Sequence, residues 1–352
     1  MWIILAWIIF LGFVFYRFRG TGSYDGPVTE RFDGRRFQNK NRIPKPTIID
    51  LIRWRMSTDR EPWPKQLIHS EPMPLPSPNA GEIVVTYVNH ASCLIQIGHL
   101  NILTDPHYSD RASPVTWAGP KRVHTPGIAY KDLPPIHVVL ISHDHYDHMD
   151  AETLLMLERD HKPIYLTGLG CDSHMKTFGL MERVHTLDWW QDIKLDGVNF
   201  TFVPAQHFSG RGLLDTDNTL WGGFVVETDN LKLYFAGDTG YGPHFTEIHE
   251  RFGPMDVSLI PIGAYHPRWF MAPRHMDPDD AVLAHKDLQS NRSIGIHFQT
   301  FHLTDEAYEQ PPIDLEIAKQ KYQVAADSFI TPEFGQSFVI GGISKKEASR
   351  LA

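Results

Sequence analysis

Ile141-Ser142-His143-Asp144-His145-Tyr146-Asp147-His148 gathers three imidazoles and two carboxylates within six residues, directly after the apolar run 136–141. In an extended segment, alternate side chains point the same way, so His143 and His145 can hold one ion. Asp147 and His148 then fall on the following turn, beside a second position. Imidazole nitrogen and carboxylate oxygen suit zinc, manganese or iron. The stretch predicts a site for two metal ions; the alternative is a solvated polar loop with capping residues.

The overall composition is that of a globular protein with a large core. The chain has 352 residues, of which 42% are hydrophobic, and a net charge of −9. Phosphate-backbone binding needs a basic surface, so the charge argues against nucleic acid as a partner. The two cysteines, Cys93 and Cys171, lack the spacing of a zinc site or a disulfide framework.

The amino terminus predicts a membrane anchor over residues 1–19. Residues 1–16 are nearly all apolar and uncharged, and Arg17 and Arg19 follow. Arginines at this end place the main domain on the cytoplasmic side. A cleaved signal peptide and a helix buried in the protein or its dimer are the alternatives. Residues 20–80, rich in Gly, Pro and charge, predict a spacer wrapped on a catalytic domain at 81–345.

Strands and helices alternate from residue 82 onward, with strand pairs in the middle. This order predicts an α/β layered fold. The expected strands are 83–88, 93–97, 101–104, 136–141, 164–167, 200–203, 220–227, 231–235, 257–261 and 293–298. The expected helices are 48–56, 151–159, 245–251, 278–288 and 315–322.

Three further strand ends carry metal-ligand side chains. His207 follows one strand, Asp238 lies in Gly237-Asp-Thr-Gly240 after another, and His297 closes a third. Each signal alone is weak. The Gly-Asp-Thr-Gly run is also typical of aspartic proteases, but a second such aspartate is not evident. Together with the 143–148 stretch, these strand ends supply the remaining ligands of two metals.

In this order, the residues resemble the metallo-β-lactamase superfamily. Longer motifs are similar to its N-acylphosphatidylethanolamine-hydrolysing phospholipase D branch, from about Arg31 to about Gly335. They are Thr104-Asp-Pro106, Ser109-Asp-Arg-Ala-Ser-Pro114, Gly119-Pro-Lys-Arg122, Leu187-Asp-Trp-Trp190, Phe235-Ala-Gly-Asp-Thr-Gly-Tyr241, Pro261-Ile-Gly-Ala-Tyr265 and Pro267-Arg-Trp-Phe-Met271.

The resemblance implies a four-layer αβ/βα sandwich with two Zn²⁺ ions per chain. By motif position, one zinc takes three histidines and the other an aspartate and two histidines, with a bridging aspartate between them. These are His143, His145 and His207 for the first, Asp147, His148 and His297 for the second, and Asp238 for the bridge. The resemblance further implies that a hydroxide shared by the two metals would attack phosphorus. Asp105 is expected to hold a ligand histidine from behind. The family likeness also suggests a homodimer.

The resemblance extends to catalytic and substrate-binding residues. Asp147 and Asp238 are implied in catalysis as well as in metal binding. His275 is implied in both catalysis and substrate binding, with a structural role as the alternative. Tyr146 is a candidate phosphate contact, with packing under the loop as the alternative. Trp269, Phe270 and Met271 are candidates for an acyl channel or a membrane contact, with core packing as the alternative.

The chain departs from its relatives at three places. Ile296-His-Phe-Gln-Thr-Phe301 replaces Ile-His-Trp-Gly-Thr-Phe, Asn89-His90 replaces Gly-His, and Arg274 replaces glutamine before His275. None of these removes a ligand, but they leave the head group and acyl preference open.

The expected function is a zinc-dependent phosphodiesterase that cleaves a membrane phospholipid into an N-acylethanolamine and a phosphatidic acid. The alternatives are a cytosolic lactonase of a phosphorylated sugar acid and a non-catalytic, metal-dependent membrane scaffold. A nuclease is disfavoured by the charge. The predicted anchor favours the phospholipid reaction, because it places the site near lipid.

Overall fold

The computed structural model describes residues 20–341, apart from 21, 42, 45, 58–59, 68–73, 181 and 213. The predicted anchor at 1–19 and the last part of the predicted domain, 342–345, lie outside the described residues. Within the described part of the chain, the helices fall short of the length and apolar character that crossing a bilayer requires.

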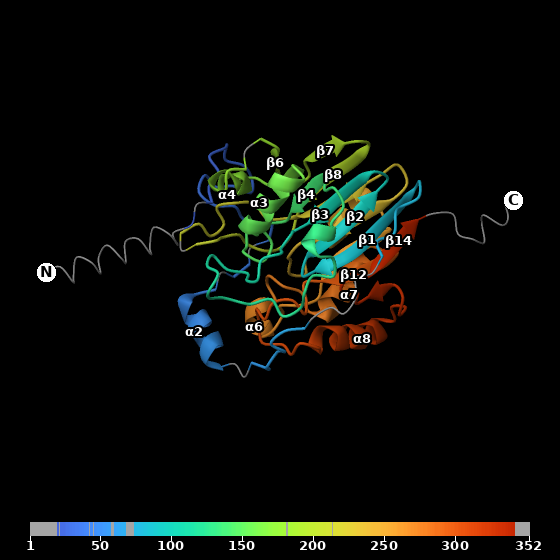
Figure 1. Cartoon of the computed structure of the whole chain (residues 1–352). Helices are drawn as coiled ribbons and strands as arrows, with labels where there is room; N and C mark the ends of the chain where they lie inside the picture. The colour runs from blue at the N-terminus through green and yellow to red at the C-terminus, as the bar shows by residue number, and fades with distance from the viewer. Residues whose placement is uncertain are drawn as a thin grey trace.

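Two seven-stranded sheets form the body of the molecule (Figure 1). The first has the strand order β14-β1-β2-β3-β4-β5-β6 and the second β13-β12-β11-β10-β9-β8-β7. The first sheet comprises β14 (Ser337–Gly341), β1 (Glu82–Asn89), β2 (Ser92–Ile97), β3 (Leu100–Thr104), β4 (Val138–Ile141), β5 (Ile164–Gly168) and β6 (Val184–Leu187). The second comprises β13 (Phe329–Ile330), β12 (Arg292–Ile296), β11 (Val257–Pro261), β10 (Lys232–Phe235), β9 (Gly223–Glu227), β8 (Val198–Val203) and β7 (Asp192–Leu195).

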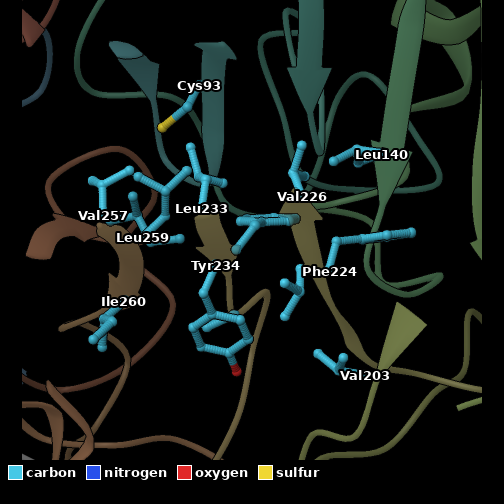
Figure 2. Close-up of a cluster of buried hydrophobic side chains, with 14 of the residues drawn as sticks. Cys93, Leu140, Val203, Phe224, Val226, Leu233, Tyr234, Val257, Leu259 and Ile260 are labelled. Atoms are coloured by element: carbon cyan, nitrogen blue, oxygen red, sulfur yellow. The ribbon is translucent and has the colours of Figure 1, made fainter. Parts of the chain in front are cut away.

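The main hydrophobic core lies between the two sheets. Cys93 and Leu140 from the first sheet and Phe224, Leu233 and Leu259 from the second belong to one buried cluster, which Figure 2 shows in close-up. All four residues of β4 are buried, as expected for a strand covered on both faces.

Helices cover the outer faces of both sheets. α3 (Ala151–Asp160) and α4 (Cys171–Thr177) share a second buried cluster with β4 and β5 of the first sheet. α5 (His244–Phe252), α7 (Pro278–Asp287) and α8 (Gln310–Tyr322) pack around the second sheet. The resulting helix, sheet, sheet, helix order confirms the predicted four-layer αβ/βα sandwich.

Strand direction places the chemistry at one edge of each sheet. β3 to β6 run parallel to one another, and so do β10 to β13. The carboxyl ends of parallel strands meet at the same edge, so the loops after β4, β10 and β12 can converge.

Several element boundaries differ from the sequence expectations. The strand expected at 293–298 ends at Ile296, because His297 has a left-handed φ of 62° and turns the chain. The helix expected at 315–322 begins at Gln310. Prolines are tolerated in its first turn, because backbone N–H groups at that position have no hydrogen-bond partner within the helix. Six further elements were not expected from the sequence: α4, β6, β7, β13, β14 and the short helix α6 (Arg268–Met271).

Parts of the 20–80 segment lie against the domain. Phe32 and Phe37 belong to the main buried cluster. α2 (Ile48–Ser57) contacts the domain through Trp54, whose Nε1 donates to Asp305 Oδ2 at 2.6 Å. Farther along, Leu67 forms a single parallel bridge with His124. The spacer therefore touches the body at several points.

Candidate metal centre

The seven residues expected to bind metal converge from four strand ends in both sheets. The 143–148 loop follows β4 of the first sheet. His207, Asp238 and His297 follow β8, β10 and β12 of the second sheet. Residues that are far apart along the chain therefore meet where the two sheets face each other.

The first group consists of His143, His145, His207 and Asp238, whose ligand atoms all lie within 4.8 Å of one another. His143 Nε2 lies 2.8 Å from His145 Nδ1, and His207 Nε2 lies 3.3 Å from the same atom. Asp238 Oδ2 is 3.8 Å from His207 Nε2. Three imidazole nitrogens and one carboxylate oxygen thus surround one point.

The second group contains Asp147, His148 and His297, together with His90. Asp147 Oδ2 lies 3.4 Å from His148 Nε2, 3.3 Å from His297 Nε2 and 3.0 Å from His90 Nε2. This group includes the three residues expected for the second ion and adds a fourth side chain.

Asp238 lies between the two groups. Its Oδ2 is 3.1 Å from His148 Nε2, and its Oδ1 is 3.2 Å from His297 Nε2. Because Oδ2 also faces His207, one carboxylate reaches ligands of both groups. This is the position that a bridging aspartate needs.

The donor set fits divalent metal ions. A tetrahedral zinc with bonds of about 2.0–2.2 Å holds its ligand atoms about 3.4 Å apart, close to the separations found here. Among the described residues, His148 Nε2, His297 Nε2 and Asp238 Oδ1 are buried atoms that lack a hydrogen-bond partner. Leaving such atoms unsatisfied is costly, and a cation at this point would satisfy them.

Neighbouring polar groups fix the orientation of the candidate ligands. His148 Nδ1 donates to Asp105 Oδ2 at 2.6 Å, the contact expected of Asp105. Ser142 N–H donates to Asp105 Oδ1 at 2.7 Å. His207 Nδ1 donates to the Arg274 carbonyl at 2.9 Å. These bonds leave Nε2 of both histidines directed at the cluster.

For several of the candidate ligands, the direction of the pKa shift favours the protonation state that metal binding requires. Burial holds the pKa of His143 and His207 well below the usual value, which keeps both imidazoles neutral. Burial would raise the pKa of Asp238, but the charge of His148 and His297 outweighs it and keeps that carboxyl ionised. Burial also lowers the pKa of His297, yet Asp238 and Asp147 raise it to about 9. A metal ion must therefore displace a proton from His297.

His275 lies at the rim of the centre. Its Nδ1 is 3.8 Å from Asp238 Oδ2, and its ring centroid is 5.0 Å from that of His207. Burial is the main cause that lowers its pKa, to about 4. A neutral imidazole beside the Asp238 carboxylate can exchange hydrogen bonds with a bound molecule, and the catalytic and substrate-binding role expected for His275 stays a prediction.

The other candidate substrate contacts lie on α6 and in the 143–148 loop. Trp269 is 46% exposed, Met271 is buried, and Phe270 stacks on Trp54 with ring centroids 5.0 Å apart. Tyr146 donates its hydroxyl to the Arg211 carbonyl at 2.8 Å and lines a cavity of about 810 Å³ behind the metal loop. The phosphate contact of Tyr146 and the acyl contacts of the α6 residues stay predictions.

Sequence reasoning missed His90. It follows β1, with a left-handed φ of 46°, and its backbone N–H donates to Thr300 Oγ1 at 2.9 Å. Its carbonyl accepts from His297 N–H at 2.7 Å. Nothing in its local sequence indicates a metal, and only the return of the chain near residue 297 brings His90 to the centre.

Comparisons with known proteins agree with this geometry. A model of the β-lactamase superfamily domain matches residues 100–298. An uncharacterized protein of Mycobacterium tuberculosis is 39% identical over 249 residues, which cover 68% of this chain and 66% of that protein. The chain thus spans just under two thirds of this relative.

Two further relatives differ in what they establish. N-acyl-phosphatidylethanolamine-hydrolyzing phospholipase D 1 of Caenorhabditis elegans is 37% identical over 266 residues, covering 72% of this chain and 75% of that protein. A metallo hydrolase from the archaeon Ignicoccus hospitalis shares the fold, with a TM-score of 0.57 and 20% identity over 74% of this chain and 99% of that one. The chain therefore belongs to the metallo-β-lactamase superfamily and is related to the N-acyl-phosphatidylethanolamine-hydrolyzing phospholipases D.

Proposed function

We propose that the chain is a zinc-dependent phosphodiesterase that hydrolyses N-acylphosphatidylethanolamine-type phospholipids to N-acylethanolamine and phosphatidic acid. The observation that carries the proposal is the pair of four-residue groups joined by Asp238. Similarity to the nematode phospholipase D over 72% of the chain supports the choice of substrate.

The side chains provide binding and orientation for this reaction. His143, His145 and His207 would hold one ion, Asp147, His148 and His297 the other, and Asp238 both. Bound zinc ions would polarise a phosphoryl group and lower the pKa of water. Asp147 would also orient the nucleophile; its Oδ2 faces three histidines. His275 at the rim would contact the substrate phosphate.

Product analysis tests the proposal. Full-length protein loaded with zinc is incubated with detergent-dispersed N-acylphosphatidylethanolamine, and both products are measured by mass spectrometry. Asp238→Ala should lose turnover, because both groups depend on this carboxylate. Soluble lactones of phosphorylated sugar acids serve as the competing substrates. Hydrolysis of a lactone without lipid turnover would overturn the proposal, and a protein inactive on both would favour the scaffold.

Metal removal provides a second test. Chelation should abolish hydrolysis, and added zinc should restore it, because the proposed chemistry depends on the ions. Metal content measured on the same samples shows how many ions are bound per chain. Full activity in metal-free protein would contradict the proposal.

We further propose that residues 1–19 attach the enzyme to a membrane, with the catalytic domain on the cytoplasmic side. The basis is the apolar run 1–16 followed by Arg17 and Arg19. Deleting residues 1–19 should reduce recovery in the membrane fraction while hydrolysis of detergent-dispersed lipid persists. If the deletion abolished both hydrolysis and folding, the segment would instead belong to the protein body.

A further inference from the structure

Helix α2 exposes an unusual set of large apolar side chains. Ile48, Ile49, Ile52 and Met56 are between 53% and 83% exposed, and Leu51 is 43% exposed. Single exposed apolar residues are common on protein surfaces, but five on one short helix are an unusual concentration. The feature therefore needs a partner.

The four most exposed of these side chains share one face, opposite the side that docks on the domain, and Leu51 lies outside that face. At about 100° per residue, positions 48, 49, 52 and 56 fall within an arc of about 100°, and position 54 falls almost diametrically opposite. Trp54 is 7% exposed, donates to Asp305 and stacks on Phe270. Trp54 thus fixes the helix with its apolar face turned outward.

The charges on α2 are arranged around that face. Arg53 and Arg55 flank the apolar arc on its two sides; the Arg53 guanidinium lies over the exposed ring of Trp269 at 4.9 Å, and that of Arg55 lies over the Trp54 ring at 5.4 Å. Asp50 lies toward the docked side, where its carboxylate accepts from Thr47 N–H at 2.8 Å. Asp50 N–H donates to Thr47 Oγ1 at 3.2 Å in return, which completes a reciprocal cap.

This charge pattern matches a lipid surface better than a second copy of the chain. Arginines beside an apolar face suit anionic head groups above acyl chains, and an exposed tryptophan suits the same boundary. A twofold interface between two such faces would bring arginines of both copies together. The single acid on the helix is already engaged by its cap and cannot relieve that repulsion.

The face is also connected to the metal centre. Phe270, which carries the stack with Trp54, belongs to α6. His275 N–H donates to the carbonyl of Met271, the last residue of α6, at 2.9 Å. Figure 1 shows α2 at the periphery of the molecule with α6 beside it. A surface that receives α2 would therefore lie next to the rim where His275 stands.

We propose that α2 lies in the interface of an anionic phospholipid bilayer, with Ile48, Ile49, Ile52 and Met56 inserted and Arg53 and Arg55 at the head groups. This contact is separate from residues 1–19 and does not depend on which bond the enzyme cleaves. It orients the rim of the site toward lipid.

Site-directed spin labelling on the full-length chain tests the inference. Ile52→Cys is labelled, and the native thiols Cys93 and Cys171 are both buried. Vesicles of phosphatidylcholine and phosphatidylglycerol are then added. The label at position 52 should lose most of its collisions with a water-soluble nickel chelate and gain collisions with oxygen, because the apolar face of such a helix lies about 5–10 Å into the head-group boundary.

Ile317→Cys on α8 is the matched control, because Ile317 is 57% exposed and also lies on a helix. Its label should stay accessible to the nickel chelate in the same vesicles. Equal accessibility of both labels on vesicles would overturn the proposal. Strong coupling between two position-52 labels without vesicles would also overturn it, since the face would then join two copies. Neither result bears on lipid hydrolysis, which the product assay measures.

Discussion

Replacing Asp105 with asparagine tests the supporting shell of the metal centre. The buried carboxylate accepts from Ser142 N–H at 2.7 Å, from Ser142 Oγ at 2.5 Å and from His148 Nδ1 at 2.6 Å. In Asp105→Asn, the amide oxygen can keep the bond to Ser142 N–H. The NH₂ group then faces His148 Nδ1–H, and two donors oppose each other. His148 must move its proton to Nε2, the atom that faces Asp147 and Asp238.

The magnitude follows from that change of tautomer. A protonated Nε2 cannot bind a metal, and loss of such a supporting partner typically costs 10–100-fold in metal affinity, or about 1.4–2.7 kcal/mol. The second ion, expected at Asp147, His148 and His297, should weaken by this factor. The first ion should be affected less, because His143, His145 and His207 keep their partners.

Chelator competition on purified full-length protein measures both affinities, and a thermal melt of the metal-stripped form checks folding. Asp215→Asn is the matched control. Asp215 is buried and accepts from Arg211 and Gly212 N–H at 3.1 and 2.7 Å, and it is not among the candidate ligands. The control should keep both affinities. A folded Asp105→Asn protein that binds both ions as tightly as the wild type would refute the reasoning.

Three other changes have definite expected outcomes. His90→Ala should weaken the second ion about tenfold in the same competition assay, because its Nε2 lies 3.0 Å from Asp147; an unchanged affinity would leave His90 a packing role. Cys93 and Cys171 should resist a thiol reagent at pH 8 until the protein is unfolded, because burial raises the pKa of both thiols; rapid labelling of native protein would contradict this. Burial lowers the pKa of His285 to about 4, whereas a histidine in the unfolded chain has a pKa of about 6.5. Between these pH values the unfolded state binds more protons, so the free energy of unfolding should fall as the pH drops from about 6.5 to about 4. Urea unfolding midpoints of the wild type and His285→Gln, measured across this pH range, check the prediction. The midpoint of the wild type should fall more on acidification than that of the variant, and an equal fall would contradict a role for His285.

The strands that build the centre were predictable because their signals are local. The buried strand before His143 is a continuous apolar run, and ligands follow directly at the chain turn. Asp238 and His297 likewise stand immediately after apolar strands. Superfamily order then indicated which strand ends belong together. Spatial convergence of these ends followed from a fold that the sequence already indicated.

The missed elements lack such signals. β7 alternates between half-buried and exposed residues at a sheet edge, and β13 contains only two residues. His90 was missed for a different reason: its partner Asp147 is 57 residues away, and its position depends on a left-handed turn. Edge strands and long-range contacts depend on tertiary packing, which a single sequence does not display.

The placement of the candidate ligands on both sheets has a mechanical consequence. Ions held by the loop after β4 on one side and by the ends of β8, β10 and β12 on the other would staple the two sheets together, in addition to their apolar packing and hydrogen bonds such as that from His297 N–H to the His90 carbonyl. At free metal a thousand times the dissociation constant, one such staple adds about 4 kcal/mol to the free energy of unfolding. Metal depletion would then shorten the lifetime of the folded chain as well as abolish the proposed hydrolysis.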